Sequence, residues 1–430
     1  MAVSVIEESE REKRPEFAIS LLSSFLTYHP SLSLLLEKNF PVIRYEEDEF
    51  GNKMPQGVVG EADHVVLLSL INGDSWIQSL TDLFMAGYFK LNGVGGRNVD
   101  KLGSLEIFYD QRMDRRGLKY FFIKNVLNVL VVKGQGSFTK LMARFMKHVV
   151  QIDYRVRIDP HSSLDAFQSE EEGIEVVDVT VAFEMLDNLI KGGFLNDDLE
   201  HDGLVNVIAG IDLGNLPLVK AIFERYGWDL AVMHKDRIPD ENGVDSKVES
   251  KLIFGDVEGK RVVLVDDMIS SGSTLIETVR EAIDEGAAEI IICSTHPVLV
   301  GDYYKNLKKL LGNEKVKVVM TTNSIPHKRP MFGSRLITKS IPYAKVDSPE
   351  SGQKIKKELE VFDVFTFVGM IIQALMNSKG DVKKIKEELA DHLVNPADKE
   401  ALFEELTGMT SPKENIDGIY REGEKVEFFY

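Results

Sequence analysis

Cysteine is almost absent from this chain of 430 residues, which contains only Cys293. A single thiol cannot form a disulfide within the chain, and it excludes zinc sites built from several cysteines. A chain without disulfides fits a reducing compartment. We therefore expect a cytoplasmic protein.

Apolar runs long enough to span a bilayer are also missing. The most apolar run, Val361 to Met376, is interrupted by Asp363 and Gln373. It is shorter than the roughly 20 residues that a transmembrane helix needs, so it predicts a buried helix. The N-terminal "MAVSVIEESEREKRPE" has no apolar core of the kind found in signal peptides. We expect no membrane partner.

Positive charge is in short supply, with 51 lysines and arginines against 69 aspartates and glutamates and a net charge of −18. A nucleic-acid-binding surface needs a basic face for the phosphate backbone. We therefore expect no nucleic-acid partner. A small anionic substrate is still compatible with the sequence, because a few local cations can bind it against the overall sign.

Apolar runs of strand length alternate with helical patterns along most of the chain, as where "ADHVVLLSLI" precedes "SWIQSLTDLFMAGYFKLNG". This alternation predicts an α/β fold with mainly parallel sheets. The length and a break near residues 190–200 predict two domains, 1–195 and 196–345. A helical C-terminal segment and extension, 346–430, follows them, and its charged patterns after residue 380 predict a surface element.

The stretch "RVVLVDDMISSGSTLIETVREAIDEG" joins a buried strand to a helix through two aspartates and a loop of small residues. The loop consists of Ser270, Ser271, Gly272, Ser273 and Thr274. Its backbone N–H groups at a helix N-terminus suit an anion. Asp266 and Asp267 suit sugar hydroxyls or a metal ion instead. The combination predicts a sugar-phosphate site, and the alternative is an ordinary strand-to-helix turn with a Ser/Thr cap.

This stretch resembles the phosphoribosyl-pyrophosphate binding motif of type I phosphoribosyltransferases. Upstream of it, "HKDRIPDENGVDSKVESKLIFGDVEGK" resembles the catalytic flexible loop of ribose-phosphate diphosphokinases, the phosphoribosyl-pyrophosphate synthetases. Lys235 and Arg237 match two basic positions of that loop, and Asp236 departs from a third. The resemblance implies that these two cations are catalytic and stabilise charge on the transferred group.

Two further stretches resemble metal- and ligand-binding parts of the same family. "VRIDPHSSLDAFQ" is similar to its Asp-Leu-His stretch, with Asp159 and His161 in the matching places and Pro160 departing. "VIAGIDLGNL" is similar to its Pro-Asp-x-Gly-Gly loop and places Asp212 near the sugar or metal. The resemblance implies that Asp159, His161 and Asp212 bind Mg²⁺, and Asp178 in "IEVVDV" matches a downstream Val-Asp of the pattern.

The nucleotide pocket is the loosest part of the resemblance. It rests on "RYEEDEFG", similar to a Phe-x-Asp/Asn-Gly-Glu stretch, and on "DQRMDRRG", similar to an Arg-Gln-Asp stretch. Asp48 and Met113 depart from these patterns. The implied ATP-binding residues are Tyr45, Glu47, Glu49, Arg112, Asp114 and His161.

The resemblance implies two tandem phosphoribosyltransferase-like domains, with ATP bound by the first and ribose 5-phosphate by the second. The implied activity is diphosphoryl transfer from ATP to ribose 5-phosphate with Mg²⁺, in a homo-oligomer, dimer or hexamer. The implied ribose 5-phosphate site consists of Asp212, Asp266, Asp267, Ser270, Ser271, Gly272, Ser273 and Thr274.

Two other functions remain open at this stage. One is a true phosphoribosyltransferase, which would not need the Tyr45, Arg112 and His161 constellation. The other is a catalytically silent regulatory subunit, suggested by the departures at Asp48, Met113 and Asp236. The sequence assigns no role to the C-terminal extension or to an insertion near residues 117–135.

Overall fold

The computed structural model describes the protein in several ranges of residues. They are 17–21, 42–47, 53–58, 64–71, 90, 99–109, 118–123, 126–131, 138–161, 163–195, 203–211, 213–239, 246–325, 359–395, 399–409 and 427–429. Within these ranges, no helix combines the length and the apolar character needed to cross a membrane.

The first sheet has seven strands in the order β3-β2-β1-β4-β5-β8-β9, and only β2 and β3 are antiparallel. Its strands are β1 (Phe17–Leu21), β2 (Val42–Glu47), β3 (Lys53–Val58), β4 (His64–Ile71), β5 (Lys101–Tyr109), β8 (Tyr154–Ile158) and β9 (Glu175–Val179). Between β7 and β9 the chain forms α5 (Phe138–Phe145), a π-helical turn η2 (Met146–Val150) and α6 (Ser163–Glu171).

The second sheet repeats this plan with the order β12-β11-β10-β13-β14-β15-β16, and only β11 and β12 are antiparallel. Its strands are β10 (Asn206–Gly210), β11 (Asp229–Pro239), β12 (Ser246–Phe254), β13 (Arg261–Ile269), β14 (Glu289–Pro297), β15 (Val316–Thr322) and β16 (Leu359–Phe362). Its helices are η3 (Leu213–Asn215), α8 (Leu216–Tyr226), α9 (Ser273–Asp284) and α10 (Tyr303–Gly312). The predicted α/β fold with mainly parallel sheets is confirmed.

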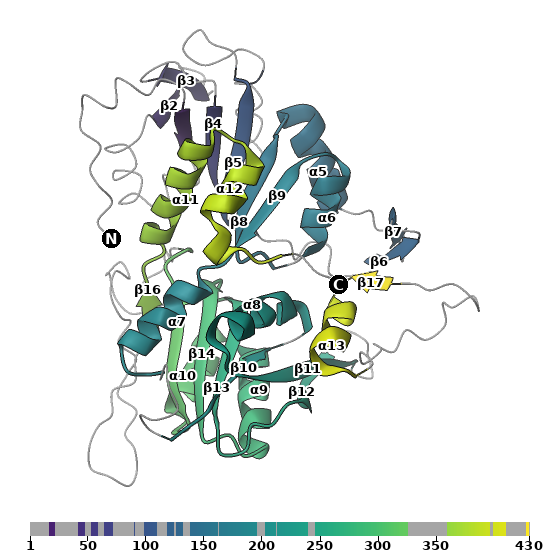
Figure 1. Cartoon of the computed structure of the whole chain (residues 1–430), viewed down its shortest axis with the longest axis vertical. Coiled ribbons are helices and arrows are strands. Elements are labelled where there is room, and N and C mark those ends of the chain that lie inside the picture. Colours follow the sequence, from purple (N-terminus) through teal and green to yellow (C-terminus); the bar gives the residue numbers. More distant parts are fainter. Residues whose placement is uncertain are drawn as a thin grey trace.

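One apolar cluster, here called the shared core, spans the two halves. Helix α7 (Ala182–Lys191), which follows the first sheet in the chain, packs against β14 of the second. Helices α11 (Phe365–Ser378) and α12 (Val382–Glu388) return from the second sheet to the first, where α12 contacts β9 (Figure 1). Buried side chains from both sheets and all three helices form a single cluster. The strands of the two halves are thereby held in a fixed relation.

The C-terminal segment is more deeply packed than its charge pattern predicts. The apolar run within α11 forms a buried helix, as expected. The predicted surface element after residue 380 is wrong for α12, because Val382, Ile385 and Leu389 lie in the shared core. Their spacing is that of one face of a helix. The lysines and glutamates between them are more numerous, so the apolar face is hard to recognise in the sequence. Strand β16 extends the second sheet beyond the predicted boundary at residue 345.

Two further elements of the C-terminal region contact earlier parts of the chain. Helix α13 (Lys399–Thr407) packs on α8, where Leu402 and Phe403 join a small apolar cluster. Strand β17 (Glu427–Phe429) pairs with β6 (Leu118–Ile123), which forms a hairpin with β7 (Val126–Val131). The insertion near residues 117–135 therefore contains a hairpin that pairs with the end of the chain.

Candidate functional site

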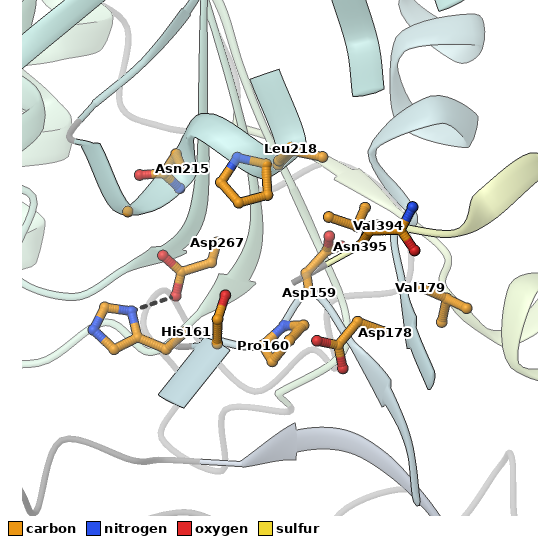
Figure 2. Close-up of a pocket in the computed structure, with 13 residues that line it drawn as sticks. Asp159, Pro160, His161, Asp178, Val179, Asn215, Leu218, Asp267, Val394 and Asn395 are labelled. Carbon is orange, nitrogen blue, oxygen red and sulfur yellow. Dashed lines mark hydrogen bonds and ion pairs between the residues drawn. The ribbon is translucent and has the colours of Figure 1, made fainter. Parts of the chain in front are cut away.

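A pocket lies between the two halves, at the carboxyl ends of strands from both sheets. Ligands of α/β proteins bind at this edge. Figure 2 shows the pocket and its side chains. It is lined by Asp159, Pro160, His161, Ser163, Asp178, Val179, Gly214, Asn215, Pro217, Leu218, Asp267, Val394 and Asn395.

The predicted anion loop connects β13 to α9. Strands β10 and β14 flank β13, and its alternating apolar residues Val262 to Val265 enter an apolar cluster on each face of the sheet, so they are at most 1% exposed. Gly272 caps α9 with φ of 75°, a backbone conformation that favours glycine. Asn306 Nδ2 donates to the carbonyl oxygen of Ser271 at 2.9 Å and holds the loop against α10. The loop therefore has the strand-turn-helix form that the sequence predicted.

The aspartate pair is held by neighbouring polar groups. Asn215 Nδ2 donates to Asp266 Oδ1 at 3.2 Å. Asp267 Oδ2 lies 2.8 Å from Nδ1 of His161, which belongs to the other half (Figure 2). Burial alone would raise the pKa of Asp267, but the charge and hydrogen bond of His161 outweigh it and hold that pKa below its ordinary value. Asp267 therefore stays an ionised hydrogen-bond acceptor near neutral pH.

Asp159 also connects the two halves. Its carboxylate accepts hydrogen bonds from the backbone N–H of Val181 at 3.1 Å and from Thr295 Oγ1 of β14 at 2.7 Å. Its φ of 40° lies in the left-handed region, which is sparsely populated by residues other than glycine. Burial raises the pKa of Asp159 to about 6, and the hydrogen bonds oppose that rise. Protein donors, rather than solvent, hold this carboxylate.

Two buried arginines support the first half of the pocket. Arg157 donates to both carboxylate oxygens of Asp178, at 2.7 and 2.6 Å, and to Asp165 at 2.8 Å. Arg155 pairs with Glu106 and Asp165, each at 2.7 Å. Burial alone would lower the pKa of Arg157, but the charges of Asp178 and Asp165 raise it above its ordinary value. Asp178 is therefore fixed in the pocket wall by a fully charged partner.

This network was not predicted from the sequence. Its only signal is the pair of arginines at alternate positions of the strand "YRVRI", which point to the same face. Alternating charged residues usually mark a solvent-facing side of a strand, whereas both of these arginines are at most 1% exposed.

His296, near the end of β14, is a buried structural residue. Its Nδ1 lies 2.9 Å from Ser324 Oγ, and its Nε2 lies 3.0 Å from the carbonyl oxygen of Ile158. Burial lowers its pKa to about 4, which keeps the ring neutral near pH 7.

Several predicted site residues are described only in part. Lys235 and Arg237 lie on β11, opposite Ser250 and Val248 of β12, and only their backbone positions are described. The same holds for Tyr45 and Glu47 on β2. The residues outside the described ranges are Glu49, Arg112, Asp114 and Asp212. The roles of all of these residues stay predictions.

The carboxylate oxygens of the pocket suit a hard cation that takes its remaining ligands from a bound phosphate group. No group of three or more His, Cys, Asp or Glu side chains in the described ranges is arranged to hold a metal ion. The pocket nevertheless presents carboxylates from Asp159, Asp178 and Asp267. Mg²⁺ prefers oxygen ligands, and it usually binds through one or two carboxylates together with substrate phosphates. The pocket therefore fits magnesium bound to a polyphosphate better than a metal held by protein alone.

Comparisons with known proteins agree with this geometry. The model of the phosphoribosyl transferase domain family matches residues 187–328. The ribose-phosphate pyrophosphokinase of Helicobacter hepaticus is 34% identical over 142 residues, which are 33% of this chain and 43% of that protein. The enzyme of the same name from Wolinella succinogenes is 31% identical over 162 residues, 37% of this chain and 50% of that protein. The matched stretch thus spans half or less of the length of these relatives.

A solved structure extends the likeness to the whole fold. The phosphoribosylpyrophosphate synthetase from Mycobacterium smegmatis superposes with a TM-score of 0.55 at 17% identity, and the match covers 84% of this chain and 99% of that one. The likeness confirms the predicted tandem arrangement of two phosphoribosyltransferase-like sheets. Residues 187–328 are thus similar to the phosphoribosyl transferase domain, part of the chain is similar in sequence to ribose-phosphate pyrophosphokinases, and the whole fold is similar to that of a phosphoribosylpyrophosphate synthetase.

Proposed function

We propose that the protein is a ribose-phosphate diphosphokinase. It transfers the β,γ-diphosphoryl group of ATP to the C1 hydroxyl of ribose 5-phosphate, giving phosphoribosyl pyrophosphate and AMP. The observation that carries the proposal is the contact of 2.8 Å between His161 and Asp267. It brings the family's nucleotide-side motif and its ribose-side motif to one pocket, as a reaction between two substrates requires.

The ribose side of the reaction uses the loop and the aspartate pair. The loop 270–274 binds the 5-phosphate through backbone N–H groups at the N-terminus of α9. Asp266 and Asp267 accept hydrogen bonds from the ribose hydroxyls. Because Asp267 stays ionised, it is a strong acceptor near neutral pH. His161 contacts Asp267 in the free protein, so the arriving ribose competes for that carboxylate.

The nucleotide side uses Asp159 and His161. These residues would hold Mg²⁺ bound to the ATP phosphates, together with Asp212. The ion, when bound, would neutralise the charge of the phosphates. Tyr45, Glu47, Glu49, Arg112 and Asp114 are proposed to bind the nucleotide.

The chemical step is a displacement at the β-phosphorus. The C1 oxygen of ribose forms a bond to this phosphorus, the bond to the oxygen bridging the α- and β-phosphates breaks, and AMP leaves with that oxygen. The proton of the C1 hydroxyl passes to solvent. Lys235 and Arg237 are proposed to stabilise the charge that develops on the transferred group, since such transfer depends mainly on positioning and electrostatics.

The proposed activity is tested by direct assay. Purified protein is incubated with ATP, magnesium and ribose 5-phosphate, AMP is followed by chromatography, and phosphoribosyl pyrophosphate is identified by mass. Equal amounts of the two products support the proposal. Substrate binding without AMP would favour a silent regulatory subunit, and binding of phosphoribosyl pyrophosphate alone would favour a transferase.

Assembly and location are proposed on the same basis. We propose a homo-oligomer, dimer or hexamer, and sedimentation as a monomer at assay concentration would contradict it. We also propose a cytoplasmic location, because both substrates are phosphorylated metabolites that the charge of their phosphates retains inside cells.

A further inference from the structure

The C-terminal region returns to the pocket through residues 389–395, here called the pocket segment. The segment follows α12, contains the turn η4 (Ala390–His392) and then crosses the carboxyl end of β9. Thr180 N donates to the carbonyl oxygen of His392 at 2.9 Å, and Val394 N donates to that of Asp178 at 3.0 Å. Leu393 forms an antiparallel bridge with Val179. The segment therefore adds a short strand-like edge to β9.

Side-chain contacts with the shared core and with two helices also hold the pocket segment in place. Leu389 is 0% exposed and lies in the shared core. His392 Nε2 lies 3.2 Å from Glu184 Oε1, and its ring packs against Phe367 with a centroid distance of 5.2 Å. A segment fixed by backbone and side-chain contacts can present the next residues at a defined position.

The residues presented in this way are Val394 and Asn395, and both line the pocket. Figure 2 shows them on the same side of the pocket as Val179. Asn395 is exposed, so its amide can reach a ligand without disturbing the core.

The amide of Asn395 has chemistry that the neighbouring acids lack. Asp159, Asp178 and Asp267 accept hydrogen bonds when ionised but repel the oxygens of a phosphate. Arg157, the buried cation behind Asp178, is already engaged by two aspartates. An asparagine amide offers two N–H donors and carries no charge. It can bind an anionic oxygen in this acidic pocket.

We propose that Asn395 contacts the nucleotide substrate and donates a hydrogen bond to one of its phosphoryl oxygens. This inference rests on the proposed function. The nucleotide is favoured over ribose 5-phosphate because Asn395 stands beside Asp178 and Val179 of the first sheet, which carries the nucleotide-side motif. The ribose motif lies on β13 of the second sheet. The pocket segment thus completes the nucleotide site from the far end of the chain.

The test compares Asn395→Ala and Asn395→Asp with the control Asn377→Ala. Asn377 is an exposed amide of the same region that donates to Glu388 at 3.0 Å, and it does not line the pocket. Loss of a hydrogen bond from this neutral amide to a charged phosphoryl oxygen should raise the KM for ATP about 10-fold or more in Asn395→Ala. Asn395→Asp should raise it further, because it also adds a carboxylate that repels the phosphates. In both Asn395 variants, the KM for ribose 5-phosphate should change less than about 2-fold. In the control Asn377→Ala, the KM for ATP should also change less than about 2-fold.

A second readout separates this inference from the proposed activity. Calorimetric titration with magnesium-ADP, without ribose 5-phosphate, measures nucleotide affinity in each variant without any turnover. If the wild type forms no AMP but both Asn395 variants bind magnesium-ADP more weakly, the inference stands while the proposed function fails. If all proteins bind it equally, or if only ribose 5-phosphate binding changes, the inference is overturned. A wild type that binds no nucleotide overturns both.

Discussion

Arg157 offers a direct test of how the pocket wall is held. The change Arg157→Met keeps much of the side-chain volume but removes three hydrogen bonds of 2.6 to 2.8 Å to Asp178 and Asp165. Asp165 keeps its ion pair of 2.7 Å with Arg155, so the carboxylate left without a cation is mainly that of Asp178. Asp178 is only 5% exposed. Removing one partner of a buried pair costs about 3–5 kcal/mol, and the retained Arg155 pair favours the lower end, about 3 kcal/mol.

The assay is urea unfolding at neutral pH with two matched variants. Arg144→Ala removes a surface ion pair with Glu172, and its side chain is 60% exposed, so the free energy of unfolding should stay nearly unchanged. Arg157→Met combined with Asp178→Asn should be less destabilised than Arg157→Met alone, because no buried charge is then left unpaired. A loss below about 1 kcal/mol in Arg157→Met, or a double variant that is worse than the single one, would refute this reasoning.

Three other changes test the site and the core. Lys235→Ala should lower turnover by orders of magnitude and leave calorimetric binding of ribose 5-phosphate nearly unchanged, since a cation acting only in the transition state contributes little to binding; unchanged turnover would exclude the role. Asp267→Ala should weaken ribose 5-phosphate binding, and an unchanged affinity would remove the hydroxyl assignment. The free energy of unfolding should fall as the pH is lowered from 6.5 to 4. Burial lowers the pKa of His64 and of His296 to about 4, so in this range the unfolded chain binds protons that the folded chain does not. Each histidine should contribute a loss of about 3 kcal/mol. Asp159, whose pKa burial raises to about 6, opposes this by about 3 kcal/mol, so urea unfolding that shows no net loss would contradict the balance.

The sequence predicted those parts of the site that are built from neighbouring residues. The loop 270–274 needs only a buried strand, a positive-φ glycine and a following helix, and all three lie within "VVLVDDMISSGSTLIETV". The tandem α/β plan was also predicted from the sequence, because the hydrophobic periodicity that marks each strand or helix depends only on neighbouring residues. The burial of α12 was not, since three apolar residues among many charges predict a surface helix until the partner that covers them is known.

The parts that the sequence did not predict are those made by contacts between distant segments. Asp159 and Thr295 are 136 residues apart, and the pocket segment meets β9 after more than 200 residues of intervening chain. Such contacts decide where the ends of the two sheets stand relative to each other. The resemblance placed Asp159 and His161 in one site but could not show that His161 pairs with Asp267 while Asp159 bonds to Thr295.

These contacts between the halves also explain why the free site can be acidic and still be stable. Each pocket carboxylate has a specific partner from the protein: Arg157 for Asp178, His161 for Asp267 and Thr295 for Asp159. The pairing of Asp178 with Arg157 belongs to a single sheet. The partners of Asp267 and Asp159 come from the opposite half, so an arriving substrate or magnesium ion that binds those carboxylates must replace contacts between the halves. If the proposed substrates bind these two aspartates, their binding is therefore coupled to the relative position of the two sheets.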